Sequence, residues 1–369
     1  MTALRRFVKK EPVLVIAALA ALVSCFFRPP DAAYLGYFDL RTLALLYALM
    51  VVVAGLRKAG LFDWLAAALC ARAGSVRALG LVLVGLSFFS SMLVTNDVAL
   101  LTFVPFAVVV LGMAGQRRAL TRVVVLQAVA ANLGSMLTPV GNPQNLYLYG
   151  HYGYSFGSFL GLTLPVWGLS LVLVLLLCLP LPRARLTPAR TERAAPDKRG
   201  LLLHGALFLV CLAVVLRLLP WPVMLGIVVL ALLLLDRPLL LRADFGLLAT
   251  FAAFFIFSGN LARMEAVAEL LSRLMAGREY LVSLGASQII SNVPAALLLS
   301  RFTGAGDALV LGVDVGGLGT PIASLASLIA LKLYARSEGA RTGRFLLEFT
   351  AVNALLLILL SAFCLLALL

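Results

Sequence analysis

Apolar runs separated by short polar segments fill the chain from residue 12 to the C-terminus. A helix needs about 20 residues to cross a bilayer. Runs close to this length lie near 12–28, 40–56, 158–179, 201–218, 222–236, 244–258 and 345–369. Two longer runs, 119–150 and 306–336, carry Pro and Gly near their middle and are expected to be interrupted helices. The pattern predicts an all-α polytopic membrane protein with about nine full spans.

Two further segments are apolar on both sides of a polar centre. Segment 78–113 is centred on Thr95-Asn96-Asp97, and segment 280–303 is centred on Ser291-Asn292. The arms of the second segment have only about 12 residues, fewer than the ~20 that a crossing needs. We therefore expect re-entrant hairpins, which dip into the membrane and return to the same side.

Three segments are too polar to be spans. Segments 61–73 and 262–276 are short and mix acidic with basic residues, which is typical of interfacial amphipathic helices. Segment 183–200 is the one long polar linker and divides the chain into two halves. The expected organisation is an N-terminal repeat (1–182), a cytoplasmic linker (183–200) and a C-terminal repeat (201–369).

Composition supports the membrane interpretation. The 369 residues are 63% apolar and 12% charged, with a mean hydropathy of +1.07. Soluble domains are about 45–50% apolar and about 25% charged. The net charge of +14 lies in short basic clusters between apolar runs, the pattern of the positive-inside rule, so no nucleic-acid partner is expected.

Charge also predicts orientation. With the N-terminus in the cytoplasm, the C-terminus outside and each hairpin returning to its own side, 23 of the 30 Lys and Arg residues are cytoplasmic. The expected location is the plasma membrane. No small-residue cleavage site follows the first apolar run, which is therefore expected to be a retained span. The five cysteines are dispersed singly in apolar runs, so no metal or other cofactor is expected beyond a coupling ion.

The halves resemble each other at their most polar points. Residues 132–139 (NLGSMLTP) align without a gap on 314–321 (DVGGLGTP), at a constant offset of 182. The same offset pairs Asn142 with Ser324 and Asn145 with Ser327, while Gly55 pairs with Gly259 at a slightly different offset. In the predicted topology the two halves run in opposite directions. Inverted repeats with interrupted helices are typical of secondary transporters, with the site near the midplane between the repeats.

Candidate binding residues lie at the two hairpin tips. Asn96 and Asn292 each offer a carbonyl oxygen for a cation such as Na⁺ and an amide for an anion. Thr95 and Ser291 add hydroxyl oxygens. The alternative is that each asparagine only caps the returning helix.

The interrupted helices supply a second group of candidates. Backbone freed by proline at membrane depth is tolerated where it lines a cavity or packs on protein; the alternative is an ordinary proline kink. The candidates in the two breaks are Thr138, Gly141, Asn142, Pro143, Gln144, Asn145, Thr320, Pro321 and Ser324.

Two acidic residues are expected at membrane depth, where an ionisable group is a functional hypothesis by default. Asp97 has the alternative role of capping the helix that starts at Val98. Asp314 has the alternative of an ion pair with a nearby arginine.

The paired hairpins, together with Gly141-Asn142-Pro143-Gln144-Asn145 and Gly319-Thr320-Pro321, resemble the ion transporter superfamily over nearly the whole chain. Members include divalent-anion/sodium symporters, citrate transporters, arsenite permeases and some sodium/proton antiporters. The dicarboxylate branch has Ser-Asn-Thr at both tips; here the third positions are Asp97 and Val293, and the Asn-Asp pair is closer to arsenite-permease relatives. The resemblance implies a homodimer and an elevator-like movement.

The sequence thus predicts a secondary active transporter for a small anion, a carboxylate or oxyanion, coupled to Na⁺ or H⁺. Alternatives with the same fold are a sodium/proton antiporter, an arsenite permease or a channel. No GxxxxGK[ST] motif is present, so ATP is not the expected driver. Gly304-Ala305-Gly306-Asp307 spells the GxGD of intramembrane aspartyl proteases, but the Tyr-Asp pair expected with it is absent. No enzymatic activity is expected.

Overall fold

The computed structural model describes residues 11–185 and 195–369, and in this part of the chain every regular element is helical. The middle of the predicted linker, 186–194, and the basic segment 1–10 lie outside the described residues. In the first half the elements are α2 (Pro12–Phe27), η1 (Ala32–Tyr37), α3 (Leu40–Lys58), α4 (Leu61–Cys70), α5 (Val76–Val94), α6 (Asn96–Met113), α7 (Arg117–Ser135), α8 (Pro143–His151) and α9 (Phe156–Cys178). In the second half they are α10 (Lys198–Val215), α11 (Trp221–Leu235), η2 (Arg237–Leu241), α12 (Phe245–Ala262), α13 (Glu265–Met275), α14 (Glu279–Ile290), α15 (Asn292–Leu299), η3 (Ser300–Phe302), α16 (Gly306–Val315), α17 (Leu325–Ala335) and α18 (Thr342–Ala367).

The prediction of an all-α polytopic membrane protein is confirmed. Among the described residues, seven helices are long and apolar enough to cross a membrane: α3, α5, α6, α9, α10, α12 and α18. Large apolar side chains on the outer helices are exposed, among them Leu202 (78%), Leu347 (74%) and Leu366 (88%). In water such a surface would be unfavourable, whereas lipid tails cover it at no cost.

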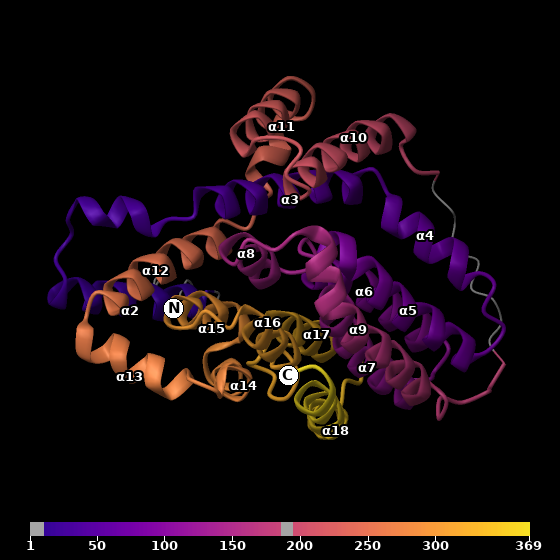
Figure 1. Cartoon of the computed structure of the whole chain (residues 1–369). Helices are drawn as coiled ribbons and strands as arrows, with labels where there is room; N and C mark the ends of the chain where they lie inside the picture. The colour runs from indigo at the N-terminus through magenta and orange to yellow at the C-terminus, as the bar shows by residue number, and fades with distance from the viewer. Residues whose placement is uncertain (1–10, 186–194) are drawn as a thin grey trace, which may run out of the picture.

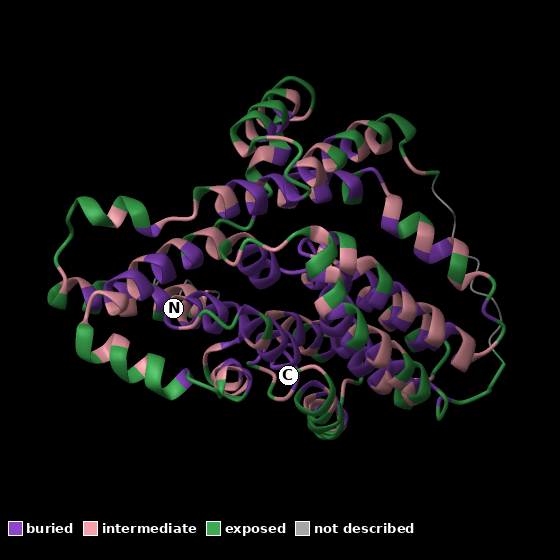
Figure 2. Cartoon of the chain, in the orientation of Figure 1, coloured by how far each residue is buried: buried purple, intermediate pink, exposed green. Residues whose placement is uncertain are grey.

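Most buried apolar side chains of the described residues form two large cores, and a smaller third one joins α3, α4, α5 and α6. One core joins α5, α6, α7 and α9 with α17 and α18, and the other joins α2, α3 and α8 with α10, α11, α12 and α15. The buried positions gather on α7, α8, α15 and α16, in the middle of the molecule (Figures 1 and 2). Helix α7 is buried around almost its whole circumference from Ala119 to Ser135. The polar residues that α7 carries are therefore held away from lipid.

The predicted hairpins and interrupted helices are present. α5 and α6 form the first hairpin, α14 and α15 the second, and the breaks separate α7 from α8 and α16 from α17. The first hairpin has arms of 19 and 18 residues, and the second has arms of 12 and 8. At about 1.5 Å per residue the first pair is long enough to cross a membrane and the second is not.

The halves share backbone detail as well as order. The hairpin turn has φ 72° and ψ 150° at Thr95, and φ 75° and ψ 152° at Ser291. Non-glycine residues rarely adopt this conformation, which costs about 1–3 kcal/mol. The breaks match too: the N–H of Gly141 donates to the Thr138 carbonyl (3.2 Å), and that of Ala323 to the Thr320 carbonyl (3.1 Å). The repeat boundaries themselves stay a prediction.

Gly55 and Gly259, which pair in the sequence alignment, each receive an aromatic ring. A Cβ on Gly55 would lie 1.9 Å from the His204 ring, and one on Gly259 would lie 2.5 Å from the Tyr37 ring. These glycines therefore allow α10 to pack closely on α3, and η1 to pack closely on α12.

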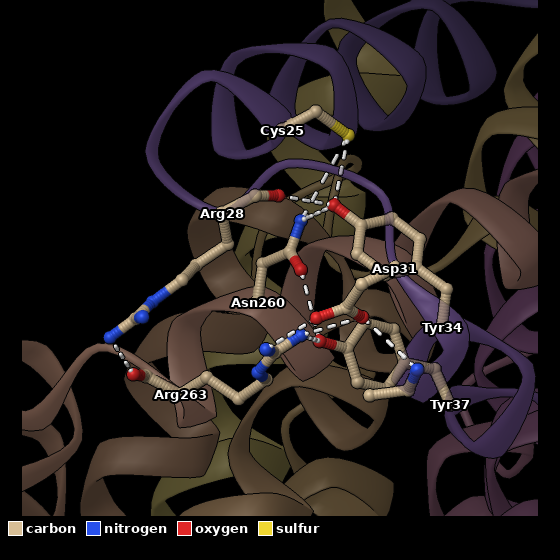
Figure 3. A network of polar contacts seen from close by, with 8 residues as sticks. Cys25, Arg28, Asp31, Tyr34, Tyr37, Asn260 and Arg263 are labelled. Atoms are coloured by element: carbon tan, nitrogen blue, oxygen red, sulfur yellow. Dashed lines mark hydrogen bonds and ion pairs between the residues drawn. The ribbon is translucent and has the colours of Figure 1, made fainter.

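A polar network holds Tyr37 against Gly259 (Figure 3). Asn260 accepts a hydrogen bond from the Tyr37 hydroxyl (3.1 Å) and donates one to the Tyr34 hydroxyl (2.8 Å). Arg263 donates to both carboxylate oxygens of Asp31, at 3.0 and 2.6 Å, and also to Tyr37. The Arg263 guanidinium lowers the pKa of the exposed Asp31 carboxyl below its ordinary value of 3.8.

Candidate functional site

The carboxylate of Asp314 lies in the last turn of α16, facing the start of α8. Asn145 Nδ2 lies 2.9 Å from Asp314 Oδ2, and Gln144 Nε2 and Asn142 Nδ2 lie 3.3 and 3.4 Å from Oδ1. Asn142 is the N-cap of α8, where its Oδ1 accepts from the Asn145 N–H. All four side chains are at least 97% buried. The break after α7 thus presents three amides to one carboxylate.

Asn132 occupies the matching position on α7. Its Oδ1 accepts hydrogen bonds from Asn96 Nδ2 (3.1 Å) and from the Ser324 hydroxyl (2.8 Å). Its Nδ2 donates to the Ser327 hydroxyl (3.2 Å) and to the Gly317 carbonyl (3.4 Å). Asn132, like Asp314, is almost completely buried.

These two networks cross between the halves in a reciprocal way. Asp314 in the second half binds Asn142 and Asn145 of the first. Asn132, its counterpart, binds Ser324 and Ser327, the counterparts of Asn142 and Asn145. An approximate twofold relation between the halves produces this exchange of partners. The site is therefore an interface of two repeats, as secondary transporters place it.

The charges of the two networks differ. Within the described part of the chain, the donors to Asp314 are all side-chain amides, a pattern that suits an ionised carboxylate. The first turn of α8 favours a negative charge, whereas the C-terminal end of α16 opposes it. None of the ion pairs found among residues 11–185 and 195–369 includes Asp314, so the expected alternative of an arginine partner is wrong. A buried carboxylate of this kind is stabilised by binding a cation or a proton.

Asn145 offers a further acceptor beside Asp314. Its Oδ1 is buried and has no hydrogen-bond partner within the described part of the chain. An unsatisfied buried carbonyl costs about 1–3 kcal/mol unless a donor or cation reaches it. The amide therefore has one satisfied end, toward Asp314, and one end open to a ligand.

The hairpin tips approach the network differently. The Asn96 side chain is engaged at both ends, since Nδ2 donates to Asn132 and Oδ1 accepts from the Asp97 N–H. In the second half the backbone N–H of Asn292 and the Ser291 hydroxyl donate to the Ala323 carbonyl, at 3.0 and 3.3 Å. A Na⁺ site at either tip remains a prediction.

Asp97 lies in a cavity rather than in the central network. The cavity, of about 230 Å³, is bounded by α3, the first hairpin, the start of α8 and the start of α12. Its polar lining residues are Arg57, Thr95, Asp97, Asn142, Arg242 and Asp244. The helix begins at Asn96, and Asp97 Oδ1 is buried without a hydrogen-bond partner in the described structure. The alternative of Asp97 as a helix cap is therefore wrong, and Asn142 connects this cavity to Asp314.

The remaining candidates have structural contacts. The Thr138 hydroxyl donates to the Met92 carbonyl, and the Thr320 hydroxyl donates to the Gln288 carbonyl (3.1 Å), so each break is tied to the hairpin of its own half. Thr320 is exposed and Pro321 half-buried, outside the central network. Gly141 and Pro143 are buried and shape the first break.

Sequence reasoning missed three contributors. Asn132 and Ser327 were in the aligned segments but were not chosen as site residues, although their alignment with Asp314 and Asn145 was a usable signal. Gln288 donates to the carbonyls of Gly316 and Leu318 (2.8 and 3.0 Å) and accepts from the Thr320 N–H. It supports the second break from the hairpin beside it.

Asp307 of the GxGD sequence is exposed and accepts a hydrogen bond from the Tyr154 hydroxyl (2.6 Å). An aspartyl protease would place this carboxylate at depth facing a second one. The motif here instead forms the start of α16.

A family model described as citrate transporter matches residues 4–305. The chain belongs to the citrate transporter family. Membership confirms the resemblance to the ion transporter superfamily and makes the protein a multi-pass membrane transporter.

Relatives of the chain are also named as membrane proteins or transporters. "Inner membrane protein YbiR" of Escherichia coli is 34% identical over 305 residues, covering 80% of each chain. "Uncharacterized transporter MJ0456" of Methanocaldococcus jannaschii is 29% identical over 328 residues, covering 88% of each. "Silicon efflux transporter LSI3" of Oryza sativa is 37% identical over 152 residues, covering 40% of this chain and 30% of that one.

Proposed function

We propose that this protein is a secondary active transporter for a small anion, a carboxylate or oxyanion, and that Asp314 carries the coupling cation. The observation behind the proposal is the single buried carboxylate in an otherwise neutral pair of networks. A proton or Na⁺ bound there satisfies both Asp314 and the open Asn145 carbonyl. No cofactor is required beyond that ion.

The cavity lined by Asp97 and Asn142 is the proposed substrate path. Its volume of about 230 Å³ suits a small solute. Two arginines on its wall, Arg57 and Arg242, can contact an anion directly, beside the carboxylates of Asp97 and Asp244. Thr95 gives the start of α6 no side-chain cap, and the positive end of the helix dipole there favours an anion.

The proposed transport cycle is elevator-like, in a homodimer of the plasma membrane with the N-terminus in the cytoplasm. The hairpins and broken helices move with the bound ion and substrate against α3 and α12. These features follow from the family resemblance and the charge pattern.

A second candidate is efflux of a small neutral hydroxylated solute in exchange for the cation. Two observations favour it: the groups that contact Asp314 and Asn132 are uncharged amides, hydroxyls and a backbone carbonyl, and a relative is named as a silicon efflux transporter. The two candidates differ in the direction of the driving gradient.

Uptake into proteoliposomes tests both. The panel contains dicarboxylates, citrate, sulfate, arsenite and silicic acid, with Na⁺ and pH gradients imposed separately. Uptake of an anion that is driven by an inward cation gradient supports symport. Uptake of a neutral solute that is driven by an outward cation gradient supports exchange. Asp307→Asn, an exposed aspartate on the same helix, is the matched control for Asp314→Asn. Equal gradient-driven uptake by both variants would reject the role of Asp314.

A further inference from the structure

A second polar cavity, of about 330 Å³, lies where α6 ends and α7 begins, next to the end of α17 and the start of α18. It is enclosed by the turn between α6 and α7, the start of α7, the end of α17 and the loop that leads into α18. Its lining residues are Gly115, Gln116, Arg117, Arg118, Thr121, Tyr334, Gly339, Arg341 and Arg344. None of them belongs to the transport site proposed above.

The lining contains four arginines and no carboxylate. Arg344 pairs through its Nε with Glu348 Oε1 (2.8 Å), an ion pair that does not use its two terminal nitrogens. Arg117, Arg118 and Arg341 take part in no ion pair found among the described residues. The positive-inside rule accounts for basic residues on one side of the membrane, but it does not require segments more than 200 residues apart to converge on one cavity.

The cavity is held together by specific contacts. The Tyr334 hydroxyl lies 2.7 Å from the Thr121 hydroxyl and accepts from the Arg341 N–H (3.1 Å). This joins the loop before α18 to α7. A side chain at Gly339, where φ is +69°, would place its Cβ 2.6 Å from Arg117 Nη1, so the glycine leaves room for the guanidinium. The fold thus fixes the backbone at Arg341 and leaves room for the Arg117 guanidinium.

Two long helices begin at this cavity. α7 and α18 start at Arg117 and Thr342, and neither has a side-chain cap for its first N–H groups. Free N–H groups and the positive end of the helix dipole attract anions. Guanidinium groups bind phosphate oxygens in pairs, with fixed geometry.

We propose that this cavity binds a phosphate group, carried either by an anionic phospholipid or by inorganic phosphate. Exposed apolar side chains flank the cavity, including Met113 at the end of α6 and Leu347 on α18, where acyl chains of a lipid would lie. A bound phosphate bridges α7 of the first repeat to α18 of the second and stabilises the fold. Such a site is independent of substrate and coupling ion.

Thermal unfolding of the purified full-length protein tests the proposal. The probes are phosphatidylglycerol or phosphatidylcholine in mixed micelles, and inorganic phosphate against equal ionic strength of chloride. Phosphatidylglycerol is expected to raise the wild-type Tm by about 2–4 °C. Arg118→Gln/Arg341→Gln should abolish the rise, whereas the charge-matched Arg72→Gln/Arg237→Gln, at two exposed arginines elsewhere, should retain it.

Comparison of the two probes identifies the source of the phosphate. A rise with inorganic phosphate alone assigns a soluble ion, and a rise with phosphatidylglycerol alone assigns a lipid. Arg118→Lys/Arg341→Lys keeps the charge but loses the paired geometry and should give less than half of the rise. If the double variant does not fold, the single Arg118→Gln replaces it. No rise with either probe, or the same rise in the cavity variant and its control, would overturn the proposal.

Discussion

The networks around Asn132 and Asp314 have the same frame but different chemistry. Both residues end a half-helix, both are buried, and both reach across to the break of the other repeat. Asn132 accepts from Asn96 and Ser324 and donates to Ser327 and Gly317, whereas Asp314 accepts from three amides. Among the described residues the charged side chain therefore meets donors alone, because a carboxylate has only acceptor atoms, whereas a buried amide needs both donors and acceptors.

This difference shows how a duplicated fold becomes functionally asymmetric. The backbone angles and turn hydrogen bonds are retained in both halves, while side chains at matched positions differ. Of the two networks, the one around Asp314 then holds the charge that a gradient can act on.

Exchanging the charge should have the largest effect. Asp314→Asn makes the two networks alike and is expected to lower gradient-driven uptake at least about 100-fold, equivalent to ~2.7 kcal/mol, because no carboxylate remains to hold the cation. The protein should still fold, since Asn132 shows that an amide fits the matching position. Proteoliposome uptake and Tm are the measurements, with Asp307→Asn as control. Asn132→Asp/Asp314→Asn, which moves the charge to the serine side, should not restore uptake; recovery would show that the amide donors are dispensable.

Making Asn145 like its counterpart should have the next largest effect. Asn145→Ser removes the 2.9 Å hydrogen bond to Asp314 together with the open carbonyl oxygen beside it. A coupling Na⁺ that this oxygen ligates is expected to bind about 10–100-fold more weakly, whereas a coupling proton should bind more tightly, because an amide donor no longer stabilises the ionised carboxylate. The reciprocal Ser327→Asn leaves Asp314 untouched and should change cation dependence less than about threefold. Half-maximal Na⁺ or proton concentration for uptake separates the two variants, and equal changes in both would contradict the assignment.

The first break should be the less tolerant of the two. A Cβ on Gly141 would lie 2.1 Å from the Ser135 carbonyl oxygen, whereas its counterpart is already Ala323. Gly141→Ala is therefore expected to destabilise by about 1–3 kcal/mol through overpacking. Gly85→Ala, in α5 with no atom within 4 Å of the new Cβ, is the control and should be neutral or stabilising. Unchanged Tm in Gly141→Ala would mean that the break relaxes freely.

The two hairpin turns should respond in the same direction. Thr95→Gly and Ser291→Gly each relieve a positive φ and should stabilise the protein by about 1 kcal/mol, less the loss of the side chain's contacts. The N-cap position of α6 makes no side-chain hydrogen bond at Thr95, so the smaller loss is expected there. Denaturation of the two variants in parallel measures this. A gain in only one half would show that the turns differ more than their angles do.

The smallest effect is expected at the Tyr37 contact, far from the site. Arg263 lowers the pKa of Asp31 in the folded protein, so this pair stabilises the protein above pH 3.8, the ordinary value, and the contribution is lost as pH falls through the lowered pKa. The His204 contact in the other half has no ion pair beside it in the described structure. Asp31→Asn should remove a slight loss of stability below pH 4, measured as Tm against pH, and an identical profile would show that the pair contributes nothing.

Sequence reasoning predicted the hairpins, the breaks and the pairing of Asn142 with Ser324, because proline, glycine and the 182-residue offset are local signals. It did not predict that these residues exchange partners between halves, since an alignment matches positions and contains no distances. For the same reason the alternative of an arginine partner for Asp314 could not be rejected from the sequence. Asn132 was overlooked because a single amide in an apolar helix reads as packing until its neighbours are known.

The rings seated at Gly55 and Gly259 have a mechanical consequence. Sliding α3 along α10 by one turn, about 5.4 Å, would drive the His204 ring into side chains larger than hydrogen. The same holds for α12 against Tyr37. The ring seated at each glycine thus prevents sliding, so α3 and α10 move as one unit, and so do α12 and η1. A conformational change that carries substrate across the membrane must therefore occur at other helix interfaces.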